Sequence, residues 1–233
     1  MNGGVATVWL DRPEKANALS AASVEALHAA IDAALADAAT HTLVIRGRGR
    51  HFCTGFDLSG LAAETDATLR ARFVALERLL QAVWHAPVRT VAVADGRAWG
   101  AGADLFASCD IRACTPGATI RFPGTAFGIV LGTRRLAELV GWDRARPLVT
   151  EGATHDAAAA LATGLATDLV EDDIDAWVAA RCVPPVADRE TLALVRHATR
   201  PDHRAADMAS LEASASRPGL VERIERYRAG LKK

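Results

Sequence analysis

The sequence predicts an α/β fold followed by a helical C-terminal region. Before about residue 125, short β-branched segments alternate with segments whose apolar residues follow helical spacing, whereas nearly every later segment is alanine-rich and helical. The chain has 233 residues, half of them hydrophobic, which is enough for one compact fold with a substantial core. We expect residues 1–175 to form the α/β core and residues 176–233 to form the helical region.

Charge, hydropathy and cysteine usage exclude several classes of protein. The 27 basic and 28 acidic side chains nearly cancel, so the clustered basic face that nucleic-acid binding requires is not expected. No run of apolar residues approaches the ~18 of a membrane span, and the first residues show no signal-peptide pattern. The four cysteines form no C-x-x-C pair. We therefore expect a cytoplasmic protein with reduced thiols and no nucleic-acid or membrane partner.

The first half of the chain contains the clearest strands and helices. Two short segments rich in β-branched residues, 5–10 and 42–45, are predicted to be strands. The first ends before Pro13, and the second ends in a glycine-containing loop. Between these strands, Ser20 is a plausible N-cap of a helix with apolar residues at three- and four-residue spacing. Residues 69–83 predict a second helix, which ends before Pro87.

The strand expected at residues 88–94 leads into a glycine turn and then a helix at 103–108. Residues 111–114 and 119–122 are short strand candidates on either side of a Pro-Gly turn. The remaining segments are expected to be helical, with glycine and proline between them: 133–140, 143–150, 155–163, 173–182, 188–198 and 203–213.

Two glycine turns, at residues 52–58 and 96–104, each follow an apolar strand. Such turns expose backbone N–H groups, and where a helix begins these groups stabilise a developing oxyanion. Each turn alone is also explained as a device for turning and close packing. A nucleotide-binding α/β domain is a further alternative that rests only on the glycines, because neither G-x-G-x-x-G nor the P-loop Lys-Ser/Thr pair is present.

The order of these motifs resembles the crotonase superfamily, the enoyl-CoA hydratase/isomerase family. The resemblance covers residues 5–175 and rests on Arg12-Pro13, Asn17-Ala18-Leu19, the two glycine turns, Cys109-Asp110-Ile111, Gly164-Leu165 and Asp168-Leu169-Val170. It implies a crotonase-like spiral of ββα units and a C-terminal region, residues 176–233, that covers the site and forms a homotrimer or a dimer of trimers. It also implies acyl-CoA thioesters as substrates. Coenzyme A is then part of the substrate, and no separate cofactor or metal is expected.

The resemblance assigns the oxyanion donors to the backbone N–H groups of Phe56 and Ala101, where Ala101 replaces the family's usual glycine. It assigns acid/base catalysis to Asp104, at a position where hydratases of the family carry glutamate. The alternative is that Asp104 only complements the helix dipole. For the coenzyme A part of the substrate, the resemblance implies contacts from Lys15, Ala16, Asp57 and Leu58.

The second catalytic glutamate of hydratases is replaced here by Gly124. Hydration ordinarily uses one group to activate water and another to protonate carbon, so isomerisation or a related enolate reaction is favoured over efficient hydration. The same absence motivates an alternative, a non-catalytic subunit that binds acyl-CoA or protein. The run from Arg217 to Lys233, with six basic residues against two acidic ones, lies near coenzyme A phosphates in relatives and is equally explained as a solvated helix.

Overall fold

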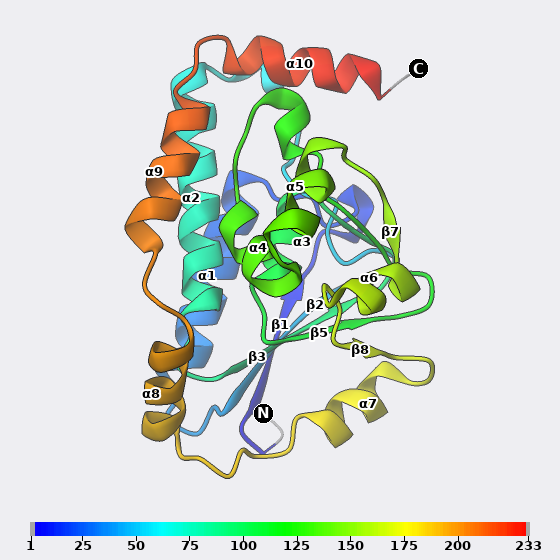
Figure 1. Ribbon diagram of the computed structural model, residues 1–233, viewed down its shortest axis with the longest axis vertical. Coiled ribbons are helices and arrows are strands. Elements are labelled where there is room, and N and C mark those ends of the chain that lie inside the picture. The colour runs from blue at the N-terminus through cyan, green and yellow to red at the C-terminus, as the bar shows by residue number, and fades with distance from the viewer. Residues whose placement is uncertain (1–2, 232–233) are drawn as a thin grey trace.

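The computed structural model describes residues 3–231 and confirms the mixed α/β class (Figure 1). The strands are β1 (Val5–Leu10), β2 (Thr42–Gly47), β3 (Arg89–Ala94), β4 (Arg97–Trp99), β5 (Ile111–Cys114), β6 (Thr119–Arg121), β7 (His155–Asp156) and β8 (Asp168–Leu169). The helices are α1 (Ala21–Ala36), α2 (Asp66–Trp84), α3 (Ala101–Ala107), α4 (Thr133–Val140), α5 (Trp142–Thr150), α6 (Ala157–Thr163), α7 (Ile174–Arg181), α8 (Arg189–Thr199), α9 (Arg204–Ala215) and α10 (Leu220–Gly230).

The larger sheet has the strand order β1-β2-β3-β5-β8, and all of its pairs are parallel. The apolar residues of its central strands are consecutive rather than alternating, because both faces of the sheet are covered. Leu43 and Ile45 of β2 join the main core with α1 and α2, whereas Val44 joins a smaller core with Val91 and Trp177 of α7. Alternate residues of one strand therefore belong to two different cores, which explains why the apolar runs lack a polar face.

The smaller sheet has the order β4-β6-β7, with β4 and β6 parallel and β6 and β7 antiparallel. Three short strands were not expected from the sequence: β4, β7 and β8. The prediction of a helix over 155–163 is wrong at its first two residues, which form β7 before α6 begins. Each of these strands is two or three residues long and is defined by its pairing with a distant segment. Such pairing leaves no periodicity to read in the sequence.

The helices near the C-terminus pack around α2. In Figure 1, α9 runs alongside α2 and α10 crosses near their ends. The carboxylate of Asp66, the first residue of α2, accepts hydrogen bonds at 2.9 Å from the N–H groups of Gly219 and Val221 at the start of α10. One side chain thus fixes the beginning of α10 relative to α2.

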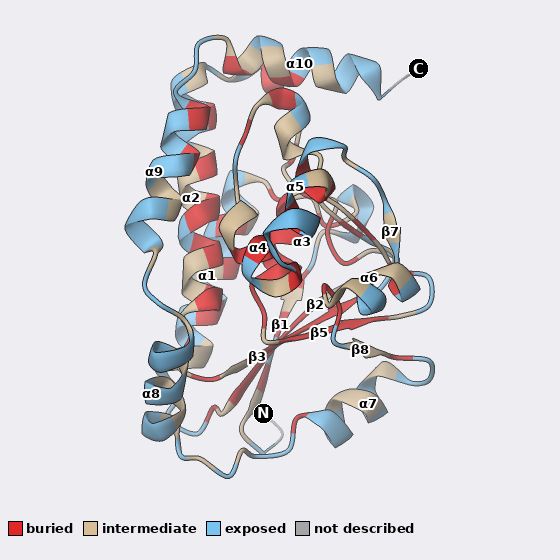
Figure 2. Cartoon of the chain, in the orientation of Figure 1, coloured by how far each residue is buried: buried red, intermediate tan, exposed pale blue. Residues whose placement is uncertain are grey.

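The helices α3 and α8 differ sharply in how far their residues are buried (Figure 2). Every residue of α3 is buried, whereas α8 has no buried residue. The helix that follows the second glycine turn is therefore held in the core, which fixes the position of its N-terminus. Within residues 3–231, no helix combines the length and apolar character that crossing a membrane would require.

Candidate active site

Two glycine turns that are far apart in the sequence meet at the site. The segment after β2 pairs in parallel with β4, and Trp99 N–H donates to the Cys53 carbonyl at 2.9 Å. On the other edge of this segment, Leu19 N–H donates to the Gly55 carbonyl at 2.7 Å. These pairings bring Gly55 against Gly100, so closely that a Cβ added to Gly100 would lie 3.8 Å from the Gly55 Cα.

The two turns present free backbone N–H groups at Phe56 and Ala101. The N–H of Phe56 is not used in the pairing with Leu19, because the flanking Gly55 carbonyl and Asp57 N–H make those bonds. Ala101 is the first residue of α3, where an N–H has no intrahelical acceptor. Over residues 3–231, neither N–H donates to another protein group, and both residues line the same cavity.

Alanine fits the second turn without strain. Ala16 and Asn17 are the non-glycine residues with positive φ in the described chain, and Ala101 is not among them. An alanine N–H donates as well as a glycine N–H, so the departure from the family's glycine leaves the donor intact.

The ring of Phe56 is held on both sides, which fixes its peptide group. It stacks on Phe73 with a centroid distance of 4.4 Å and an interplanar angle of 15°. The guanidinium of Arg72 lies 4.0 Å from the centroid of the Phe56 ring and also donates to the Asp57 carbonyl at 3.0 Å. Aromatic stacking and a cation–π contact therefore immobilise the residue that presents the first N–H.

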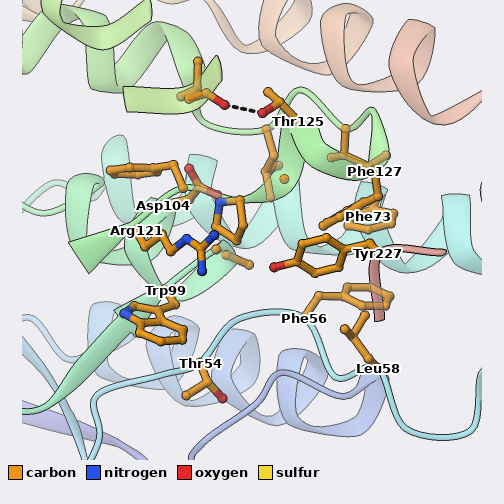
Figure 3. Close-up of a pocket in the computed structure, with 18 of the residues that line it drawn as sticks. Thr54, Phe56, Leu58, Phe73, Trp99, Asp104, Arg121, Thr125, Phe127 and Tyr227 are labelled. Atoms are coloured by element: carbon orange, nitrogen blue, oxygen red, sulfur yellow. Dashed lines mark hydrogen bonds between the residues drawn. The ribbon is translucent and has the colours of Figure 1, made fainter. Parts of the chain in front are cut away.

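Asp104 lies one turn of α3 beyond Ala101 and lines the cavity (Figure 3). Only 8% of its surface is exposed, and its carboxyl group makes no hydrogen bond within the described part of the chain. Burial raises the pKa of Asp104 well above its usual range, while Arg135 opposes the rise and Glu77 adds to it. Gly132, with φ +65°, leaves space for this carboxyl: a Cβ there would lie 2.4 Å from Oδ1.

Arg135 does little to offset the burial of Asp104 because two other carboxylates pair with it. Arg135 and Glu77 are each 1% exposed at the side chain and are joined at 2.5 and 3.0 Å. The Arg135 Nη1 also donates to Asp207 at 3.0 Å. In this cluster two carboxylates face the Arg135 guanidinium, so little of its positive charge is left to stabilise an ionised Asp104.

The cavity has a volume of about 290 Å³ and mostly apolar walls. Asp104 is the one carboxylate among the described residues that line it. The hydroxyl groups of Thr54 and Thr125 already donate to the carbonyls of Ala16 and Val149. They can accept hydrogen bonds, but they do not replace a second carboxylate.

The position of the missing glutamate has room for a side chain. Gly124 lines the cavity at the start of a 3₁₀ turn, Gly124–Phe127, and its φ lies outside the left-handed region. A Cβ added there would meet only the Ile129 carbonyl, at 3.5 Å. The lack of a carboxylate at this point is therefore a property of the sequence rather than a demand of the fold.

The four residues expected to contact coenzyme A lie near the cavity in different ways. Ala16 and Leu58 line it. Lys15 is exposed at the end of a 3₁₀ turn, Pro13–Lys15. The Asp57 carboxylate is buried and paired with Arg12 at 3.0 Å, so that side chain is committed to holding the loop.

Sequence reasoning missed three polar residues of the cavity: Arg97, Arg121 and Tyr227, of which Arg121 and Tyr227 are labelled in Figure 3. Tyr227 is the single tyrosine of the chain and comes from α10. It shares one face of that helix with the buried residues Leu220 and Ile224, at helical spacing. This pattern was available in the sequence, but it did not show which surface the face covers. Arg121 ends β6 and had no distinguishing motif.

Cys53, next to the first turn, is buried and free, and burial raises the pKa of its thiol to about 12. A thiol of this kind is not a nucleophile at neutral pH. Residues 3–231 contain no group of three or more His, Cys, Asp or Glu side chains arranged to hold a metal ion.

Comparison with known proteins decides the family. The sequence model of the enoyl-CoA hydratase/isomerase family matches residues 1–215. The chain belongs to this family. As an enoyl-CoA hydratase/isomerase family member, it is 37% identical over 183 residues to a probable enoyl-CoA hydratase of Mycobacterium leprae, covering 76% of this chain and 72% of that one.

Solved structures of family members share the fold. A candidate enoyl-CoA hydratase/isomerase from Bordetella parapertussis aligns with a TM-score of 0.90 and 40% identity, over 98% of this chain and 96% of that one. An enoyl-CoA hydratase/isomerase from Xanthobacter autotrophicus aligns with a TM-score of 0.87 and 25% identity, over 100% and 91%. These similarities confirm the crotonase-like fold and place the chain in a family of enzymes that process acyl-CoA thioesters.

Proposed function

We propose that the cavity binds an acyl-CoA thioester and stabilises its enolate. In this proposal, the N–H groups of Phe56 and Ala101 donate to the thioester oxygen, on which negative charge develops. The free state of both groups and their common cavity support this role. Donors of this kind each contribute ~2.7–4 kcal/mol of transition-state stabilisation.

Asp104 is the group that transfers the proton. Its carboxylate removes a proton from the α-carbon, next to the thioester carbonyl, and the electron pair of the broken C–H bond moves onto the thioester oxygen. The neutral carboxylic acid then returns the proton to another carbon as the enolate collapses. The observation that carries this proposal is a single carboxylate, buried and with a raised pKa, one helical turn from the Ala101 N–H.

This arrangement favours isomerisation, or a related reaction that needs one acid/base group, over efficient hydration. Hydration requires a second group to activate water. Among the described residues that line the cavity, Asp104 is the one carboxylate, and the other polar side chains are hydroxyls, arginines and the Trp99 indole. Thioester hydrolysis and decarboxylation also proceed through one such group and an oxyanion site.

Coenzyme A is proposed to lie along the rim formed by Lys15, Ala16, Asp57 and Leu58. The Asp57 side chain is held by Arg12 and its N–H by the Leu19 carbonyl, so its proposed contribution is to position the neighbouring Leu58 and Phe56. The basic run from Arg217 to Lys233 is proposed to approach the phosphates of the coenzyme A that is bound in a neighbouring subunit. The last two residues of this run, Lys232 and Lys233, lie outside the described residues.

A homotrimer or a dimer of trimers in the cytoplasm is the proposed state of the protein. Exposed apolar side chains support assembly: Leu194 and Val195 of α8 are 65% and 50% exposed, and α8 buries none of its residues. The four cysteines are free, which fits a reducing compartment. Size-exclusion chromatography with light scattering measures the assembly directly.

The test of catalysis is exchange of α-protons for deuterium in butyryl-CoA, followed by NMR in deuterated water. Wild-type protein should catalyse exchange, and the rate should rise with pH through the raised pKa of Asp104, because only the carboxylate removes a proton. Asp104→Asn should abolish exchange while the dissociation constant for butyryl-CoA stays nearly unchanged, since the oxyanion donors are backbone groups. Binding without any exchange in the wild type would favour the alternative, a non-catalytic acyl-CoA-binding subunit.

A further inference from the structure

One wall of the cavity carries a cation without a counterion. The Arg121 Nε donates to the Gly152 carbonyl at 2.8 Å, which fixes the plane of the guanidinium. Across residues 3–231, its two Nη groups have no acceptor, and no carboxylate pairs with it. The guanidinium is half-buried, and a ligand that displaces water from the mostly apolar cavity must supply acceptors for its four unused N–H donors.

A second donor faces the same space. The Tyr227 ring packs on Phe127 with a centroid distance of 5.1 Å, and its hydroxyl makes no hydrogen bond within the described part of the chain. The helix that carries it is tied down by Arg223, which donates to the Phe127 carbonyl at 2.9 Å. Figure 3 shows the Tyr227 hydroxyl and the Arg121 guanidinium both directed into the cavity.

The electrostatic field of Arg121 reaches the phenol. Burial raises the pKa of Tyr227, and the charge of Arg121 opposes that rise. The hydroxyl is therefore a stronger donor than burial alone would leave it, and the space between the two groups favours negative charge. Burial raises the pKa of Asp104, which disfavours a negative charge there that would oppose this field.

We propose that Arg121 and Tyr227 form a subsite for a carboxylate on the acyl group, so that the substrates are acyl-CoA thioesters whose acyl chain carries an acid. A carboxylate accepts hydrogen bonds from a guanidinium and a phenol at the same time, which satisfies both free donors. The inference rests on the proposed function, because it assumes that the thioester occupies this cavity.

A phosphate of coenzyme A is the other source of the same anionic oxygen chemistry. The acyl source is favoured because Arg121 and Tyr227 share a small apolar cavity with Asp104 and the two oxyanion donors. The phosphates of coenzyme A are strongly hydrated and belong at an exposed rim rather than beside the reacting carbon.

Calorimetric titration with matched ligand pairs distinguishes the two sources. The pairs are malonyl- and propionyl-CoA, succinyl- and butyryl-CoA, and glutaryl- and valeryl-CoA, whose members have equal carbon number and differ in a terminal carboxylate. In at least one pair the wild type should bind the acidic member about tenfold or more tightly. Arg121→Gln should remove this preference without changing affinity for the neutral member, and Tyr227→Phe should reduce it while keeping the ring.

Arg144→Gln is the matched control, since it removes the same charge from an exposed arginine that does not line the cavity. It should leave the preference intact. Equal affinities within all three pairs in the wild type would overturn the inference and leave the proposed function standing. Equal weakening of both members and of free coenzyme A in Arg121→Gln would also overturn it, by assigning Arg121 to the phosphates. Failure of every ester to bind the wild type would overturn the proposed function and the inference together.

Discussion

The contact between the two glycine turns makes a sharp prediction for Gly55→Ala. A Cβ at this position would lie 2.6 Å from the Trp99 carbonyl oxygen and 3.2 Å from the Ala101 nitrogen. The first distance is well below van der Waals contact, so the two backbone segments must separate. Because these segments carry the Phe56 and Ala101 N–H groups, their separation misplaces at least one of the two proposed oxyanion donors.

The expected loss follows from the donor that is misplaced. Losing one oxyanion donor costs ~2.7–4 kcal/mol of transition-state stabilisation, or about 100- to 1,000-fold in rate. Gly55 also has φ +92°, which disfavours alanine by roughly 1–2 kcal/mol in stability. Strain alone would lower the free energy of unfolding without lowering the rate of the folded enzyme.

Gly60→Ala separates the two effects. Gly60 has φ +72°, similar to Gly55, but a Cβ there would meet nothing within 4 Å. In urea unfolding, the backbone strain should lower the free energy of unfolding by a similar amount in both variants, and the crowding at Gly55 should lower it further in Gly55→Ala. Only Gly55→Ala should lose α-proton exchange activity by the factor given above, measured at saturating butyryl-CoA. Equal exchange rates in the two variants would refute the argument that close approach of these turns sets the oxyanion geometry.

Two further predictions concern the carboxylates of the site. Gly124→Glu should raise the rate of crotonyl-CoA hydration by about 100-fold or more, because the position has space and a general acid/base group typically contributes that much. Gly124→Gln is the control and should not raise the rate. The absorbance of the conjugated enoyl thioester follows the reaction, and equal rates for the two variants would contradict the prediction. Asp104→Asn should be more stable than the wild type at pH 8, because the raised pKa of Asp104 means that its ionisation destabilises the folded state. In urea unfolding at several pH values, this difference in stability should shrink as the pH falls towards the ordinary aspartate pKa of about 3.9. A difference that does not depend on pH would show that desolvation of the carboxylate is not its cause.

The sequence indicated those parts of the fold that local patterns encode. The strands β1, β2 and β3 were predicted from β-branched apolar runs, and Ser20 was predicted as an N-cap. In the structure, the Ser20 hydroxyl accepts from Ser23 N–H at 3.1 Å. The glycine turns were predicted from the residues themselves, whereas the roles of Asp104 and Gly124 were implied by the family resemblance that the order of the motifs carries. Each of these features is written into neighbouring residues, so a sequence is sufficient to find it.

Contacts between distant segments decided the rest. The pairing of the Cys53 segment with β4 places Gly55 against Gly100, and no local pattern contains that register. The short strands β7 and β8 exist only because β6 and β5 pair with them. Tyr227 enters the cavity because α10 is fixed across the site by long-range bonds, including the one from Arg223 to Phe127.

The sequence by itself determined which residue types are available for chemistry: one carboxylate on α3, glycines that leave N–H groups accessible, and glycine in place of a second acid. Only the tertiary structure decided which of them face one another, that Asp104 loses its solvent, and that Arg121 and Tyr227 share its cavity. The physical reason is that desolvation and convergence depend on chain segments far apart in sequence, whereas local propensity depends on neighbours.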